Sequence, residues 1–190
     1  MVLIAVHGIA SRFLPAERGT VHLSIEFEHE DRATAVQQAA MLHGRFIAEA
    51  TAWVESGAAT WWGSAQVWVR AEHRHEGAAQ TLRTLQLASA GVQVRFQDFA
   101  ALSTWILEAG SVPGVSVDQV VWEVTRAHRA AAERALRVEA VGDAIERAEA
   151  YASAIGGGGV ALQAVWEEGL RPSESQQQPR WGAQRLSNRT

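Results

Sequence analysis

The chain has 190 residues, of which 47% are hydrophobic and 20% charged, the composition of an ordinary globular protein. It contains no cysteine, which excludes disulfide bonds, thiolate metal sites and cysteine nucleophiles. All 17 basic residues are arginine, which excludes a Schiff-base or Walker lysine. The net charge of -4, with the arginines scattered along the chain, predicts that nucleic acid is not a partner.

The first third of the chain predicts two strands and a long helix. Residues 2–9 are apolar and rich in β-branched side chains, which favours a first strand. From Val21 to Glu28, apolar and polar residues alternate, which is typical of a strand with one buried face. Asp31 is a suitable N-cap for a helix whose apolar residues recur at helical steps until Gly57. We expect one stripe of this helix to pack on a sheet.

The middle of the chain predicts two further strands and a short helix. Residues 65–71 alternate between apolar and polar, as a strand does. Within residues 85–96 the apolar positions change parity, which we interpret as a β-bulge near residues 88–91. Asp98 then caps a short helix with an apolar inward face.

The last third predicts a strand, the longest helix and a closing strand. Residues 115–124 are rich in valine and favour a strand, in which apolar residues of both parities indicate burial on both faces. An alanine-rich helix is expected over residues 127–155, ended by the glycines at 156–159. Residues 160–166 alternate as a final strand.

The order of these elements predicts an α+β fold. We expect a mostly antiparallel sheet with long helices packed on one face, in two interlocked ferredoxin-like subdomains. The folded domain should cover residues 1–169, and the Ser-, Gln- and Pro-rich residues 170–190 should form a flexible tail. Residues 2–6 lack the features of a signal peptide, and no stretch approaches the roughly 18 apolar residues of a membrane span. We therefore expect a cytoplasmic protein with no membrane partner.

Three segments carry a family resemblance. The opening strand contains Gly8-Ile9-Ala10 and is followed by a loop proline, and residues 92–99 run from a strand into an Asp-capped helix. The alanine-rich helix includes Asp143 and Arg147 and leads through a glycine turn to a closing strand. In this order, over residues 2–168, the chain resembles the SIMPL-domain family, the YggE-like proteins of unknown function.

The resemblance implies a mode of action rather than a reaction. Members of this family are associated with self-assembly, with envelope or oxidative-stress physiology in bacteria and with signalling in animals, and no shared catalytic residues are recognised. We therefore expect a bacterial protein that is not an enzyme, binds no cofactor and forms a homo-oligomer through protein–protein contacts.

Two tryptophans are candidate interface residues. Trp68 lies on the polar phase of its strand and should be exposed in a monomer, and Trp122 lies in the valine-rich strand. Aromatic anchors of this kind suit an oligomer interface. The alternative is that each indole lies flat under a helix or tail of its own chain.

A second function is also considered, in which the chain is a small-ligand or metal-binding module. His73 and His75 share one strand face by their spacing, and with Glu76 they offer a metal two imidazoles and a carboxylate. A cleft near the two histidines would then hold the ligand. The simpler interpretation is that these side chains are solvated at the end of a strand.

Other polar groups have a structural interpretation. Glu26 and Glu28, followed by Glu30 and Asp31, would suit acid–base chemistry, but charged residues on an antiparallel strand usually face water. His43 lies beside the apolar stripe of the first long helix and is expected to be a core or interface histidine.

Overall fold

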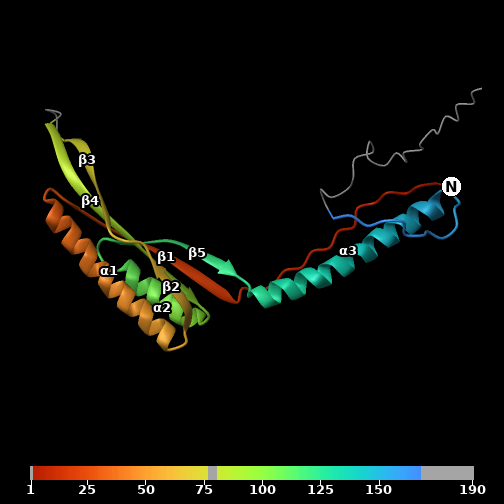
Figure 1. The fold of residues 1–190 in the computed structure, drawn as a ribbon, viewed down its shortest axis with the longest axis horizontal. Helices are drawn as coiled ribbons and strands as arrows, with labels where there is room; N and C mark the ends of the chain where they lie inside the picture. The colour runs from red at the N-terminus through yellow and green to blue at the C-terminus, as the bar shows by residue number, and fades with distance from the viewer. Residues whose placement is uncertain (1, 77–80, 168–190) are drawn as a thin grey trace, which may run out of the picture. The chain divides into compact units, whose positions relative to one another are not determined.

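The computed structural model describes residues 2–76 and 81–167. Over these residues the fold is α+β, and its strands pair in antiparallel fashion. In chain order its elements are β1 (Arg18–His29), α1 (Arg32–Glu55), β2 (Ala59–Ser64), β3 (Trp68–Glu76), β4 (Thr81–Phe96), α2 (Phe99–Gly110), β5 (Val115–Glu123) and α3 (Arg126–Ala154) (Figure 1). None of the described helices is both long and apolar enough to cross a bilayer.

The chain divides into two compact units. The sheet unit comprises residues 11–135, and the terminal unit comprises residues 1–10 and 136–190. Helix α3 begins in the sheet unit and continues in the terminal unit.

The sheet is organised around β4, its longest strand, with 16 residues. One side of β4 pairs with β1. The other side pairs with β3 along residues 81–89 and with β2 along residues 92–96. β5 pairs with the far side of β1. The outer strands are therefore β5 on one side and β2 and β3 on the other.

The β-bulge predicted near residues 88–91 is wrong. β1 and β4 pair in one unbroken register from Gly19 opposite Phe96 to His29 opposite Gln86. The two parities occur because apolar side chains lie on both faces of β4: Val92 points into the helix-covered core, whereas Leu87 is buried on the other face. Register shifts occur instead in the β1–β5 and β2–β4 pairs.

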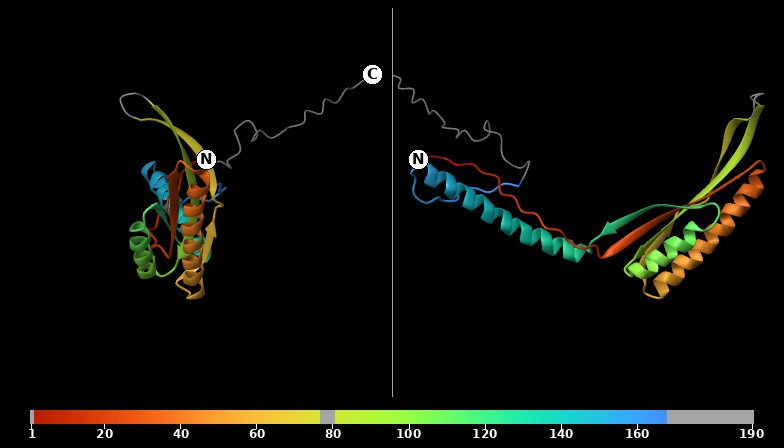
Figure 2. Two further views of the ribbon diagram at one scale, coloured as in Figure 1. Left: turned by 90° about the vertical axis from the view of Figure 1, so that its left-hand side faces the viewer. Right: turned by 180° about the vertical axis from the view of Figure 1, so that it is seen from behind.

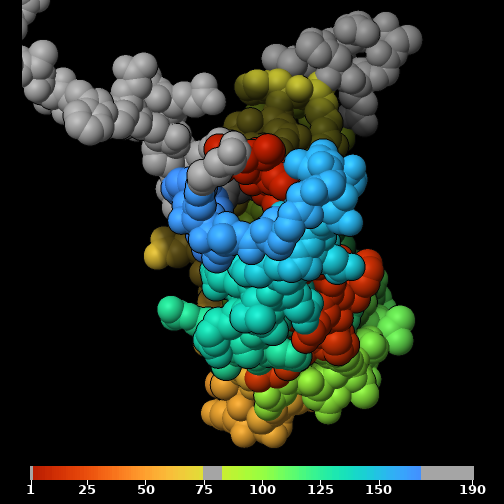
Figure 3. Space-filling model, turned by 90° about the vertical axis from the view of Figure 1, so that its right-hand side faces the viewer, coloured from red at the N-terminus to blue at the C-terminus, as the bar shows by residue number. Residues whose placement is uncertain are grey.

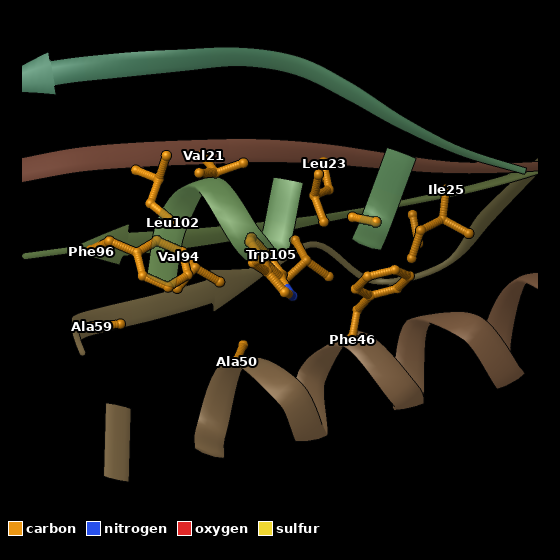
Figure 4. Packing of buried hydrophobic residues seen from close by; sticks show 13 residues of the cluster. Val21, Leu23, Ile25, Phe46, Ala50, Ala59, Val94, Phe96, Leu102 and Trp105 are labelled. Atoms are coloured by element: carbon orange, nitrogen blue, oxygen red, sulfur yellow. The ribbon is translucent and has the colours of Figure 1, made fainter. Parts of the chain in front are cut away.

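The main core lies between the sheet and the helices α1 and α2, which cover the same face (Figures 2 and 4), and a smaller cluster of Ala35, Ala39 and Ala88 lies between α1 and β4. Trp105 of α2 is at its centre, with the rings of Phe46 and Phe96 at 6.1 and 5.5 Å between centroids. The indole N–H of Trp105 donates to Glu49 of α1 at 3.0 Å, so the polar atom of this buried ring is satisfied. The buried set is Val21, Leu23, Ile25, Phe46, Ala50, Ala59, Ala90, Val92, Val94, Phe96, Leu102, Trp105 and Ala109.

Both predicted helix caps are confirmed. The Asp31 carboxylate accepts from the N–H of Thr34 at 2.7 Å, and Asp98 accepts from Ala100 at 2.8 Å. Each pairing satisfies an N–H group at the start of a helix that has no partner within the helix. Gly57, which follows the C-terminus of α1, adopts φ +77°, a conformation that favours glycine.

Four strand predictions need correction. Residues 59–64 form the unpredicted strand β2, and β3 begins at Trp68 rather than residue 65 and extends to Glu76. Residues 2–9 and 160–166 are extended but belong to no strand. An alternating pattern supplies an apolar face, but a strand also needs a neighbouring strand for its backbone groups. Residues 2–10 instead run beside α3 (Figures 1 and 2).

Candidate functional site

Trp68 is half-exposed on the sheet face away from α1 and α2. It lies on β3 opposite Ser89 of β4, and 47% of its surface is exposed, as the sequence predicts. The guanidinium carbon of Arg70 lies 5.5 Å from the centroid of its ring, a cation–π contact. Trp68 therefore presents a large aromatic surface at an outer strand of the sheet.

Trp122 lies at the opposite side of the sheet and on its other face. Its ring contacts Phe99 at the start of α2 edge-on, with 5.1 Å between centroids, and it covers the backbone of Gly19. A Cβ at Gly19 would come within 2.9 Å of this indole, so the glycine allows the close packing. Trp122 is still 53% exposed and Val121 is exposed as well. The prediction that both faces of this strand are buried is therefore wrong.

Trp61 forms a third aromatic surface that the sequence pattern did not identify. It lies on β2 opposite Arg95, whose guanidinium carbon is 5.3 Å from the ring centroid. The ring also covers Gly63, where an added Cβ would come within 2.8 Å of it. The only sign of this surface in the sequence was the adjacent pair Trp61-Trp62. Because no strand was predicted there, the sequence did not indicate which of the two rings would face solvent.

Three of the four candidate acid–base carboxylates, those of Glu28, Glu30 and Asp31, have structural partners. Glu28 accepts two hydrogen bonds from the guanidinium of Arg74, and Glu30 accepts one from Arg83. Asp31 caps α1, and its hydrogen bonds from the side chain and backbone of Thr34 lower its pKa. These contacts agree with the interpretation that Glu28 and Glu30 form surface ion pairs with arginines and that Asp31 caps a helix.

Of the three predicted metal ligands, His73, His75 and Glu76, the structure describes the side chain of His73. Nδ1 of His73 lies 3.0 Å from the hydroxyl of Thr84 on the neighbouring strand. The side chains of His75 and Glu76 lie outside what the structure describes, although their backbone belongs to β3. In the described part of the chain, no three His, Asp or Glu side chains are grouped so that they could hold a metal ion.

His43 lies on α1, and its Nε2 atom is buried without a hydrogen-bond partner. Burial lowers the pKa of this imidazole, since the charged form would lose its hydration. A neutral histidine beside the apolar stripe agrees with the predicted structural role.

A carboxylate that sequence analysis missed fixes the start of α3. Glu17, just before β1, accepts from the backbone N–H of Thr125 at 2.6 Å and lies 2.8 Å from Nδ1 of His128. Hydrogen bonds from Thr125, through its side chain and its backbone, and then from His128 lower the pKa of Glu17 to about 2. In a capping box the third helical residue itself accepts from the N-cap N–H. In α3 the third helical residue is His128, which carries no carboxylate. The carboxylate that accepts from the N–H of Thr125 belongs to Glu17 instead, which lies 108 residues away in sequence.

In the terminal unit, residues that carry the family resemblance come together. The N–H of Ile9 donates to the carboxylate of Asp143 at 2.8 Å, and Arg147 pairs with the same carboxylate at 3.0 Å. Gly8 lies directly on α3, where an added Cβ would come within 1.9 Å of the carbonyl oxygen of Ala140. The bond from Ile9, followed by the contact with Arg147, lowers the pKa of Asp143. Figure 3 shows the N-terminal segment, in red, against α3.

Comparison with known proteins identifies a family for this chain. The family model named SIMPL, described as a protein of unknown function (DUF541), matches residues 4–187. No curated protein matches the chain. Because the match covers nearly the whole sequence, the chain belongs to the SIMPL family, whose function is not known.

Proposed function

We propose that the chain is a self-associating interaction protein that catalyses no reaction and acts through surfaces at the edges of its sheet. Among the described strands, β3 pairs with β4 alone and β5 with β1 alone. Each therefore has an edge whose N–H and C=O groups can accept a strand from another chain.

One observation carries this proposal: each of these two edge strands presents a half-exposed tryptophan. Trp68 lies on β3 and Trp122 on β5, and both have about half of their surface in solvent. Tryptophan is enriched among the residues that contribute most to protein–protein interfaces. Because the two edges lie on opposite sides of the sheet, contact between unlike edges would build a ring or a chain of subunits.

The contacts of the polar groups support a role without catalysis. The carboxylates of Glu28 and Glu30 hold arginines, and that of Asp31 caps a helix. A location in the bacterial cytoplasm and a part in the response to stress complete the proposal, and both rest on the sequence and its family resemblance.

Light scattering of the purified protein over a range of concentrations tests the proposal. We expect a mass above that of the monomer at high micromolar concentration, and we expect Trp68→Ala to weaken the assembly by about tenfold, as removal of an interface anchor does. Leu107→Ala is the matched control, because Leu107 is 75% exposed and lies on α2, outside the edge strands β3 and β5. A wild-type protein that stays monomeric throughout contradicts the proposal.

A further inference from the structure

The sheet face opposite α1 and α2 carries two half-exposed tryptophans and no helix. Among the described residues nothing helical packs on it, because α1 and α2 lie on the other face and α3 packs on none of the strands. Trp61 on β2 and Trp68 on β3 have 43% and 47% of their surface in solvent. We call this surface the open strip; it consists of Trp61, Gly63 and Trp68 with Ser89, Gly91, Gln93 and Arg95 of β4, Thr20, His22, Ser24 and Glu26 of β1, and Gln119 of β5.

The two tryptophans lie on the same face and far apart along the sheet. Trp61 pairs with Arg95 and Trp68 with Ser89, and directly paired residues place their side chains on the same face. The two β4 positions are six residues apart, which is about 20 Å along a strand at about 3.4 Å per residue. A ligand that contacts both rings is therefore a long molecule.

Gly91 lies between the two rings in β4, and the fold does not require its lack of a side chain. β1 and β4 pair without a bulge at this position, and the φ of Gly91 lies outside the left-handed region that favours glycine. An added Cβ would have only the carbonyl oxygen of Leu23 within 4 Å, at 3.6 Å, which is an ordinary contact. Glycine weakens the interior of a strand, and one in this position often marks the close approach of a ligand.

Hydrogen-bonding groups line the open strip beside Gly91. Gln93 of β4 is exposed, and His22 of β1, which pairs with it, is partly exposed. Gln119 of β5 continues the same row and is exposed as well. The hydroxyl of Ser24 donates to the carboxylate of Asp118. The two amides and the imidazole can donate to and accept from the hydroxyl groups of a ligand.

The charges on the open strip fit a neutral ligand. Each tryptophan has an arginine against its ring, Arg95 at 5.3 Å and Arg70 at 5.5 Å from the ring centroid. Both guanidiniums also pair with carboxylates, Glu123 at 3.4 Å and Glu72 at 2.6 Å. A cationic ligand would meet these arginines, whereas a polyanion such as single-stranded RNA would meet paired arginines and the exposed carboxylate of Glu26.

A long, neutral ligand with apolar faces and many hydroxyl groups is an oligosaccharide. A pyranose ring presents C–H groups on its faces, which stack on an indole, and hydroxyl groups at its rim, which hydrogen-bond to amides and imidazoles. Antiparallel sheets of other folds bind oligosaccharides on a face in this way. An extended peptide pairs its backbone with the edge of a sheet instead, and the open strip is a face. A chain with β-1,4 linkages is straight enough to reach from one ring to the other.

We propose that the open strip binds a neutral, β-1,4-linked oligosaccharide. Its sugar rings stack on Trp61 and Trp68, and the chain between them passes over the backbone of Gly91. This binding goes beyond the self-association proposed above, because Trp61 and Gly91 lie on neither β3 nor β5.

Isothermal titration calorimetry of the full chain with cellohexaose and with chitohexaose tests the proposal. We expect saturable binding of at least one of them, with a dissociation constant below about 1 mM, and Trp61→Ala should raise that constant by about tenfold or more. Trp166→Ala is the matched control, because Trp166 is 47% exposed but belongs to the terminal unit. Absence of saturable binding of both sugars, or equal weakening by the two variants, overturns the proposal.

Gly91→Val separates ligand binding from stability. Valine favours a strand and an added Cβ has room here, so the melting temperature should equal or exceed that of the wild type. The branched side chain fills the space over β4 and should raise the sugar dissociation constant by about tenfold or more. Gly44→Ala on α1 is the control, because nothing lies within 4 Å of its added Cβ and binding should not change. A folded Gly91→Val that binds sugar as tightly as the wild type contradicts the proposal, and if this variant fails to fold, Trp61→Ala decides.

Light scattering of the same variants distinguishes this proposal from self-association. Trp61→Ala and Gly91→Val should lose sugar binding but assemble as the wild type does. If neither sugar binds while the wild-type chain assembles, sugar binding is overturned and self-association stands. If sugar binds to a chain that stays monomeric, the reverse holds. Binding of poly(U) in preference to both hexasaccharides would assign the open strip to nucleic acid and overturn the proposal.

Discussion

The sheet unit and the terminal unit contain similar apolar sequence but bury it to different degrees. In the sheet unit, strands β1 and β4 and helices α1 and α2 enclose Trp105 and its neighbours completely. In the terminal unit, α3 and two extended segments leave Val138, Ile155 and Leu162 mostly in solvent. The difference shows that an apolar pattern becomes a core only where two layers face each other.

The two units also differ in how their backbone groups are satisfied. The strands of the sheet unit share continuous antiparallel ladders. In the terminal unit, residues 2–10 contact α3 at isolated points rather than along a ladder. These points are the close approach of Gly8 to α3 and the hydrogen bond from the N–H of Ile9 to Asp143. We therefore expect substitutions in the two units to affect different measurements.

The largest effect is expected at the centre of the sheet unit. Trp105→Ala removes a fully buried indole and leaves a cavity between α1 and the sheet, and it should lower the free energy of unfolding by about 3–5 kcal/mol. Denaturant titration followed by fluorescence measures the loss. Leu107→Ala on the same helix is the control and should change stability by about 0.5 kcal/mol or less, because Leu107 is exposed. Similar losses in both variants would mean that Trp105 is not the centre of the core.

A smaller and local effect is expected in the terminal unit. Gly8→Ala places a Cβ within 1.9 Å of the Ala140 carbonyl oxygen, so the N-terminal segment must move from α3, at a cost of about 1–3 kcal/mol for that contact. Hydrogen exchange of the Ile9 amide, which donates to Asp143, should become faster, while denaturant unfolding of the sheet unit stays unchanged.

Gly142→Ala is the matched control for Gly8→Ala. The added methyl group has nothing within 4 Å, and alanine favours the helix by about 0.5–1 kcal/mol over glycine. Exchange at Ile9 should therefore be no faster than in the wild type. An unchanged exchange rate in Gly8→Ala would show that the segment is not held at this contact.

The smallest effect is a dependence of stability on pH at the start of α3. The pKa of Glu17 is about 2 in the folded chain against an ordinary value of 4.5. Folding therefore favours its charged form, and the resulting stability is complete above about pH 4.5 and is lost as the pH falls through 2. Glu17→Gln should be less stable than the wild type at pH 7, and the difference should shrink between pH 4.5 and 2.

The exposed carboxylate Glu108 at the end of α2 provides the control for this pH profile. Glu108→Gln should leave the steepness of the acid transition unchanged. If Glu17→Gln and the wild type lose stability in parallel between pH 4.5 and 2, the Glu17 contact does not stabilise the folded chain.

Local signals predicted several elements correctly. Asp31 and Asp98 cap helices as expected, because a cap depends on neighbours within three residues. The alternation from Val21 to Glu28 correctly identifies β1 and its buried face. The exposure of Trp68 was predicted from the alternation of its own strand, residues 65–71.

Contacts between distant residues could not be predicted in this way. The acceptor for the N-cap of α3 is Glu17, far away in the chain, and no local pattern connects it with Thr125. The exposure of Trp122 depends on which strand lies beside β5, and the sequence does not specify that neighbour. Strand β2 was missed because Trp61-Trp62-Gly63 has no clear alternation, yet it pairs with β4.

The sequence by itself determined the classes of chemistry that are excluded, the helix caps and the alternation of the first sheet strand, because these depend on residue type and short-range spacing. The tertiary structure decided which alternating segments became strands. Residues 2–9 and 160–166 have strand-like patterns but no neighbouring strand among the described residues, and α3 supplies the surface beside residues 2–10 instead. The hydrogen bonds of a β-sheet join two neighbouring strands, and where the second strand lies is decided by the whole fold.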